Sequence, residues 1–179
     1  MGRTNRKREY IRKIFLKKSL THITKGYYIM NMKFKSSKRI GPISTGHRQW
    51  KDDGHCSFVH GYGRYVEFTF TCEERDEKGW VMDFGDLRDV KQWLEEQWDH
   101  RLLLAHDDPL IGLFEGLHKL GGVNINVLPE GYGPGIEDSC KYVYDNIDLM
   151  IRDKTDNRVW IHKVRVYEHK NNWAEYGLQ

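Results

Sequence analysis

Residues 64–72, with the sequence RYVEFTFTC, alternate between polar and apolar side chains more regularly than any other part of the chain. Successive side chains of a β-strand point to opposite faces, so this spacing places one apolar face on the strand, made of Val66, Phe68, Phe70 and Cys72. The segment is therefore predicted to be a strand of a sheet that buries one of its faces.

Three other segments are predicted to be strands. They cover residues 32–44, with a bulge or bend at Gly41-Pro42, and residues 123–127 and 159–167. Residues 80–82 are predicted to be extended as well. The residues after the last strand are interpreted as a polar tail.

Three segments have apolar residues at helical intervals or clear helix boundaries. They are residues 86–98, residues 108–122, which open with Asp-Pro and close with Gly-Gly, and residues 136–152. Long helices between short alternating strands favour an α+β fold with a largely antiparallel sheet.

Charge divides the chain into two parts. Residues 1–31 carry nine Lys/Arg and one Glu, a net charge of +8. The chain has 29 basic and 26 acidic residues in all, so residues 32–179 carry twenty basic and twenty-five acidic residues, a net charge of −5. We interpret 1–31 as a basic extension, poorly ordered or translated upstream of the true start. A nucleic-acid or anionic-surface arm is the alternative. Residues 32–179 have the length of a single domain.

Composition excludes several classes of protein. No stretch of about 18 or more apolar residues is present, so we expect no membrane span. The basic N-terminus lacks the apolar segment of a secretory signal.

The three cysteines, Cys56, Cys72 and Cys140, form a poor disulfide framework and fit a reducing cytoplasm. Cys72 and Cys140 lie in predicted regular structure and are expected to be buried.

Two histidines flank the loop between the first two predicted strands. Since such strands pair readily, the imidazoles of His47 and His60 can reach one point. Zinc favours imidazole and thiolate ligands, and catalytic zinc sites use three protein ligands with one open position. Tyr62 would share one side of the strand with His60, although a phenol must be deprotonated to bind zinc well. His55 and His106 are the other candidates for the third ligand.

Three further groups are candidates for chemistry. Cys56 lies in the same loop, where a nearby cation would favour its thiolate as a base or nucleophile; a buried loop cysteine is the alternative. The adjacent Asp99 and His100 pair a carboxylate with an imidazole, as general acid–base catalysis requires. Glu168 ends the last predicted strand. It is either a capping glutamate or the acceptor of two hydrogen bonds from the amino-pyrimidinone edge of a pterin or guanine.

In this order and at these spacings, the motifs resemble those of the 6-pyruvoyl- and 6-carboxy-tetrahydropterin synthase family. The resemblance runs from about residue 33 to residue 176. The segments that carry it are Ser44-Thr-Gly-His47, Cys56-Ser-Phe-Val-His60-Gly-Tyr62, Val81-Met-Asp-Phe-Gly-Asp-Leu87, Asp99-His100-Arg-Leu-Leu-Leu104, Ile136-Glu137 and Val166-Tyr-Glu168.

The resemblance implies a tunnelling fold (T-fold), in which an antiparallel sheet carries helices on one face. Subunits of this fold join into a barrel, trimers stack as a homohexamer, and the active sites lie between subunits. The implied activity is that of a lyase acting on 7,8-dihydroneopterin triphosphate. We favour 6-carboxytetrahydropterin as its product, on the route to 7-deazaguanine nucleosides such as queuosine, with 6-pyruvoyltetrahydropterin as the alternative.

The resemblance also assigns roles to residues. His47 and His60 would bind zinc, which polarises the substrate's side-chain oxygens while triphosphate leaves. Cys56 would be the general base. Asp99 and His100 would relay protons, and Glu168 and Glu137 would bind the pterin.

Two positions depart from the family pattern. Tyr62 stands where the family has its third zinc histidine, and Gly133-Pro-Gly-Ile136 stands where it usually has Pro-Thr. Three outcomes remain open at Tyr62: a phenolate ligand, a shell completed by His55 or water, or weakly held zinc. The last outcome leads to an alternative function, a pterin- or purine-binding protein without catalysis.

Overall fold

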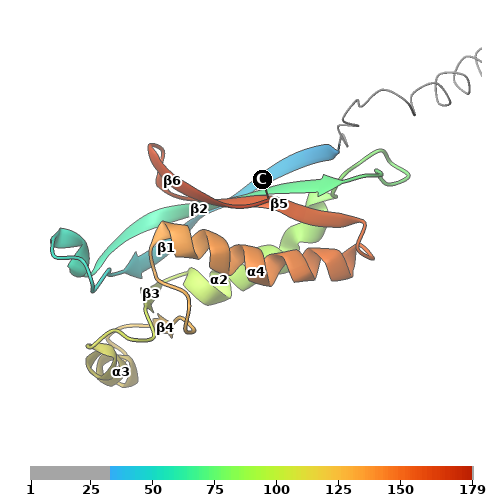
Figure 1. Ribbon diagram of the computed structural model, residues 1–179. Coiled ribbons are helices and arrows are strands. Elements are labelled where there is room, and N and C mark those ends of the chain that lie inside the picture. Colours follow the sequence, from blue (N-terminus) through green and yellow to red (C-terminus); the bar gives the residue numbers. More distant parts are fainter. Residues whose placement is uncertain (1–32, 179) are drawn as a thin grey trace, which may run out of the picture. The chain divides into compact units, whose positions relative to one another are not determined.

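The computed structural model describes residues 33–178. A six-stranded sheet forms the body of this region (Figure 1). Its order is β4-β3-β1-β2-β5-β6, with bounds β1 Phe34–His47, β2 His60–Cys72, β3 Arg101–Leu104, β4 Ile125–Val127, β5 Val159–His169 and β6 Asn172–Gly177. The interpretation of residues 1–31 as an extension lies outside the described residues and stays a prediction.

The strand directions make the sheet mixed. The long strands pair antiparallel, β1 with β2, β2 with β5 and β5 with β6, as the sequence predicts. The short strands β3 and β4 differ from that prediction, because β3 runs parallel to β1 and β4 runs parallel to β3. They extend the sheet only beside the end of β1, where Thr45–His47 pair with Arg101–Leu103.

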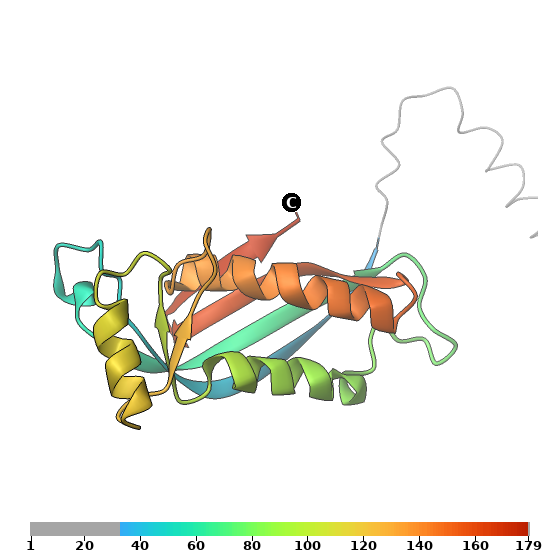
Figure 2. The same cartoon turned by 90° about the horizontal axis from the view of Figure 1, so that it is seen from below.

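Helices cover one face of the sheet. Figure 2 shows α2 (Arg88–Trp98) and α4 (Ile136–Lys154) side by side across that face. Their buried residues pack against the apolar face of β2 in one core, which includes Val90, Leu94, Trp98, Val143, Ile147, Val66, Phe68 and Phe70. The predicted alternation of residues 64–72 is therefore confirmed. None of the described helices is long and apolar enough to span a bilayer.

A second, smaller apolar cluster lies under α3 (Ile111–Lys119). It consists of Leu102, Leu104 and Phe114, with Val123 and Ile125 packed against it. Two short 3₁₀ helices, η1 (His55–Ser57) and η2 (Phe84–Leu87), complete the described elements. The η2 helix leads directly into α2, and the Asp83 carboxylate accepts a hydrogen bond from the Gly85 amide at its start, as an N-cap residue does.

The predicted bulge in the first strand is confirmed. The pairing of β1 with β2 shifts between Ile40 and Ile43, and Gly41 has a φ of 129°, a conformation that favours glycine. A Cβ at Gly41 would lie 2.6 Å from the carbonyl oxygen of Arg64. The strand can therefore make this bend only with glycine at position 41.

Two predictions of local structure are wrong. Residues 80–82 do not form a strand; the segment bends at Val81, and the buried side chains of Val81 and Met82 join the core instead. The residues after β5 are not a polar tail, because residues 172–177 form β6, which pairs with β5. Five of its six residues are exposed, so this edge strand has no buried apolar face that would mark it in the sequence.

Candidate active site

One cavity gathers most of the predicted site residues. It has a volume of about 550 Å³ and lies where β1 ends, β2 begins and β5 ends. The candidate residues that line it are His47, His55, Cys56, His60, Tyr62, Glu137 and Glu168. Pairing of β1 with β2 and of β2 with β5 brings together residues that are more than 100 positions apart in the chain.

His47 and His60 face each other because the strand register pairs them. Their Cα atoms are partners across β1 and β2, and the ring centroids are 4.2 Å apart. The Tyr62 ring centroid lies 6.0 Å from that of His47 and 5.7 Å from that of His60. The three side chains predicted to share one metal therefore lie together.

Hydrogen bonding and burial make both imidazoles suitable metal ligands. His60 Nδ1 lies 2.8 Å from the carbonyl oxygen of Phe58, which can only accept, so Nδ1 donates this hydrogen bond and Nε2 is the ring nitrogen that could bind a metal. His47 is 2% exposed, and its Nδ1 has no hydrogen-bond partner among the described residues. Burial, followed by the positive charges of Arg64 and His60, lowers the pKa of His47 to about 3, so this imidazole is neutral at ordinary pH.

The third position fits zinc less well. Burial, followed by the negative charges of Glu168 and Cys56, raises the pKa of Tyr62, which favours the protonated phenol. Within residues 33–178, no three His, Cys, Asp or Glu side chains lie close enough to hold a metal ion. The donor set therefore fits a zinc ion held by two imidazoles, with a phenol beside them where a third imidazole would serve best.

The other two candidate ligands lie in different places. His55 is exposed and lines the cavity from η1. His106 lines a separate cavity of about 250 Å³, together with Trp50 and Lys51. Cys56 is a partly buried free thiol in η1, and its carbonyl oxygen accepts a hydrogen bond from the Gln49 amide at 2.8 Å, which ties the two ends of the loop together.

Asp99 and His100 form a pair but do not line this cavity in the described chain. Asp99 Oδ2 lies 3.0 Å from His100 Nδ1. The backbone of Ser44 holds the pair from both sides, since its amide donates to Asp99 Oδ1 at 3.3 Å and its carbonyl accepts from the His100 amide at 2.8 Å. The His100 side chain is 80% exposed. The His100 imidazole is therefore open to solvent in the described chain.

The two glutamates approach the cavity from different elements. Glu137 lies in the first turn of α4, where the helix dipole favours a negative charge, and Glu168 lies near the end of β5. Both line the same cavity as His47 and His60.

Sequence reasoning missed two residues near these groups. His169 places its ring centroid 6.2 Å from that of Tyr62. Arg64 is fully buried behind the site. The sequence did mark Arg64 as unusual, because this charged residue lies on the same face of the strand as Val66, Phe68 and Phe70, the face predicted to be buried.

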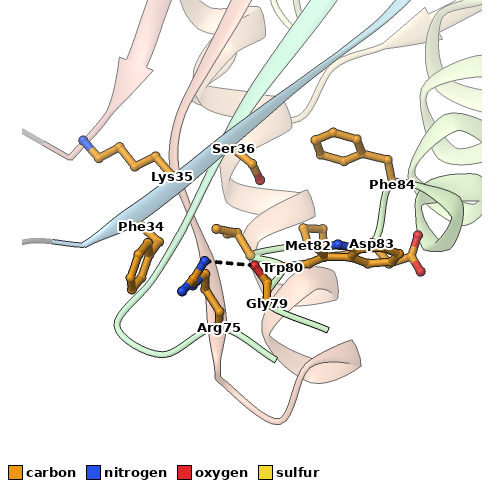
Figure 3. Close-up of a pocket in the computed structure, with 10 residues that line it drawn as sticks. Phe34, Lys35, Ser36, Arg75, Gly79, Trp80, Met82, Asp83 and Phe84 are labelled. Carbon is orange, nitrogen blue, oxygen red and sulfur yellow. Dashed lines mark hydrogen bonds between the residues drawn. The ribbon is translucent and has the colours of Figure 1, made fainter. Parts of the chain in front are cut away.

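A second, mostly apolar cavity of about 530 Å³ lies at the opposite end of β1. Figure 3 shows Phe34, Trp80 and Phe84 around it, with the Arg75 guanidinium donating a hydrogen bond to the Gly79 carbonyl at 3.4 Å. The three aromatic side chains are between 41% and 46% exposed. None of the predicted site residues lines this cavity.

Comparison with known proteins now identifies the family. Residues 37–179 match the family model described as 6-pyruvoyl tetrahydropterin synthase. The chain belongs to the tetrahydropterin synthase family. A Rickettsia typhi protein named 6-carboxy-5,6,7,8-tetrahydropterin synthase is 35% identical over 144 residues, which cover 79% of this chain and 98% of that protein. A Rickettsia felis protein of the same name is 37% identical over 79 residues, which cover 44% of this chain and little more than half, 56%, of that protein.

Solved structures confirm the tunnelling fold. An uncharacterised protein from Wolinella succinogenes matches with a TM-score of 0.71 at 19% identity, covering 83% of this chain and 99% of its own. The 6-pyruvoyl tetrahydropterin synthase of Caenorhabditis elegans matches with a TM-score of 0.56 at 16% identity, covering 83% and 97%. The tetrahydropterin synthase family and its fold, both expected from the sequence motifs, are therefore confirmed.

Proposed function

We propose that this family member is a lyase that converts 7,8-dihydroneopterin triphosphate and water to 6-carboxytetrahydropterin, acetaldehyde and triphosphate, in the biosynthesis of 7-deazaguanine nucleosides such as queuosine. Support for the product comes from the relatives named 6-carboxy-5,6,7,8-tetrahydropterin synthase. The observation that carries the proposal is the single cavity in which His47 and His60 meet Cys56 and Glu168. The three free cysteines of the described chain fit a reducing compartment such as the cytoplasm.

The cavity has the size and the polar groups that a pterin requires. Its volume of about 550 Å³ lies within the range of small-molecule sites, roughly 300–1,000 Å³. The Glu168 carboxylate can accept two hydrogen bonds from the amino-pyrimidinone edge of the pterin ring. Glu137 lines the same cavity at the start of α4 and would contribute a second acceptor.

Proton transfer is assigned to Cys56 and to the Asp99–His100 pair. Cys56 lines the cavity beside the two histidines, where its thiolate would accept a proton from the substrate side chain. Asp99 orients His100 through their 3.0 Å contact, so His100 would carry the proton onward. Zinc held by His47 and His60 would polarise the side-chain oxygens of the substrate and acidify the neighbouring C–H bonds.

Assembly would complete this site. We propose that copies of the chain join edge to edge into a barrel and stack as a homohexamer. In the described residues β1 pairs on its outer side only over Thr45–His47, and β6 has no partner beyond β5. Unpaired edges are ready templates for another chain. Exposed aromatic side chains accompany both edges: Phe34, Trp80 and Phe84 near β1, and Trp173 and Tyr176 on β6.

The second candidate function is a pterin- or purine-binding protein without catalysis, and Tyr62 is the observation that favours it. A site with two imidazoles and a protonated phenol holds zinc less tightly than one with three imidazoles. Incubation of the zinc-loaded protein with 7,8-dihydroneopterin triphosphate separates the two. Release of triphosphate with a new pterin supports the enzyme, whereas binding of intact substrate without turnover supports the binding protein.

A further inference from the structure

A charged side chain occupies a core position directly behind the candidate active site. Arg64 lies in β2 two residues after Tyr62, on the inward face of the strand that otherwise carries Val66, Phe68 and Phe70, and its side chain is 0% exposed. No carboxylate forms an ion pair with it in the part of the chain that the structure describes. A buried charge is costly, so its hydrogen bonds must be favourable for the fold to keep it there.

The hydrogen bonds of Arg64 go to one segment of the chain. Nη1 donates to Ser139 Oγ at 3.1 Å, and Nη2 donates to the carbonyl oxygen of Pro134 at 2.9 Å. The guanidinium carbon lies 5.8 Å from the ring centroid of Trp98, within range of a cation–π contact. Arg64 therefore joins the core of β2 and α2 to both sides of the turn that begins α4.

That turn forms part of the cavity wall. Gly135, Ile136 and Glu137 line the cavity, and they lie between the two points that Arg64 contacts. On its other side the turn contacts the side chain of Gln49, whose amide nitrogen an added Cβ at Gly135 would overlap. The Gly133 amide also donates to Asp138 Oδ2 at 2.9 Å, which closes the turn on itself.

We propose that Arg64 is a positioning residue that holds residues 134–139 against β2 and so fixes Glu137 as part of the pterin site. This inference rests on the proposed function, since the ligand whose site is fixed is the pterin. A guanidinium suits the role because its planar fork donates to two acceptors at once, whereas a lysine ammonium directs a single charge on a flexible stem. Arg64 does not line the cavity, so it would act on binding through Glu137 and the backbone of the turn.

The test compares Arg64→Met, Arg64→Lys and Ser139→Ala with a matched control, Arg39→Met. Arg39 is an exposed arginine of β1 that pairs with Glu67 at 2.8 Å and makes no contact with residues 134–139. Steady-state kinetics with 7,8-dihydroneopterin triphosphate should show KM raised about tenfold in Arg64→Met, the scale expected when a hydrogen bond to a charged group is lost, with kcat nearly unchanged. Arg64→Lys should lie between wild type and Arg64→Met, and Arg39→Met should match wild type.

Amide hydrogen exchange of the substrate-free protein gives a second readout that needs no enzymatic activity. The amides of residues 135–139 should exchange faster in Arg64→Met and Ser139→Ala than in wild type, and Arg39→Met should leave them unchanged. Equal exchange and equal KM in Arg64→Met and wild type would overturn the proposal, as would a fall in kcat at constant KM. If Arg64→Met does not fold, Arg64→Lys and Ser139→Ala decide by the same criteria. Failure of wild type to bind or convert the triphosphate would instead defeat the proposed function, and the exchange data would still decide the role of Arg64.

Discussion

His47 and His60 are Cα partners across β1 and β2, and their imidazole rings lie 4.2 Å apart. The pairing register places both rings at the same end of the sheet, one at the end of β1 and the other at the start of β2. The Phe58 carbonyl fixes the tautomer of His60, and burial keeps His47 neutral. Two imidazoles at a common point are the basis of the proposed zinc site.

Removal of one of these imidazoles should remove the metal. We expect His60→Ala to lose zinc during dialysis against a weak chelator under conditions in which wild type keeps it. His106→Ala is the matched control, because His106 lines a different cavity. Elemental analysis gives the zinc content per chain, and equal content in His60→Ala and wild type would show that zinc binds elsewhere.

Tyr62→His should strengthen zinc binding. The substitution adds an imidazole beside the other two, in place of a phenol whose pKa is raised by burial and by nearby negative charge. We expect zinc affinity, measured by chelator competition, to rise roughly tenfold or more, the scale on which partners at metal sites act. Unchanged or weaker affinity would indicate that Tyr62 already binds the metal as phenolate or that zinc lies elsewhere.

Cys56→Ala should abolish most of the turnover while substrate still binds. A positioned general base contributes roughly 10²–10⁴-fold to rate, so kcat should fall by that factor and the dissociation constant of the substrate should stay close to that of wild type. Ser57→Ala is the control from the same 3₁₀ helix. Full turnover in Cys56→Ala would assign the base to another residue.

Thiol labelling should distinguish the three cysteines. Cys56 is partly exposed, whereas Cys72 and Cys140 are buried, and burial raises the pKa of both buried thiols, that of Cys140 to about 12. At pH 8 a thiol reagent should therefore modify one cysteine rapidly in the native protein and all three after denaturation. Rapid modification of two or three thiols in the native protein would contradict the described core.

The raised pKa of Cys140 also has a consequence for stability. The unfolded thiol ionises from its ordinary pKa of 9.0, while the folded thiol keeps its proton up to about 12. The unfolded state therefore binds fewer protons above pH 9, and stability should fall as pH rises from about 9 to about 12. Cys140→Ala should flatten this part of the stability profile measured by denaturant titration, and an unchanged slope would show that Cys140 does not contribute to it.

Sequence patterns predicted the core of the fold well. The alternation of residues 64–72 gave the central strand, and helical spacing gave α2 and α4, because these elements bury one regular face. Short or polar elements were harder to predict. Arg101–Leu104 is too short to show an alternating pattern, and β6 is an edge strand whose pairing depends on β5 rather than on its own side chains.

The candidate site was only partly predictable for a similar reason. Motif order pointed to His47, Cys56, His60 and Glu168, which the strand register does bring to one cavity. Asp99 and His100 do not line that cavity in the described chain, and under the proposed assembly they would reach a site from another copy. The buried Arg64 was missed because its role depends on its contacts with Pro134 and Ser139, some 70 residues away.

Assembly should depend on the aromatic cavity beside β1. Trp80 is 46% exposed there, and we expect Trp80→Glu to give a folded protein of lower molecular mass in light scattering, because a charge would be buried between copies. Leu120→Glu is the control, since Leu120 is 85% exposed on a different element. An unchanged mass for Trp80→Glu would place the interface elsewhere.

Product analysis tests the account most directly. Purified zinc-loaded protein is incubated with 7,8-dihydroneopterin triphosphate, and the pterins and released phosphates are separated and identified by mass. We predict stoichiometric release of triphosphate and acetaldehyde with formation of 6-carboxytetrahydropterin, and loss of all three products in Cys56→Ala. A pyruvoyl side chain on the product would correct the product assignment, whereas intact substrate after prolonged incubation would contradict the proposed enzymatic function.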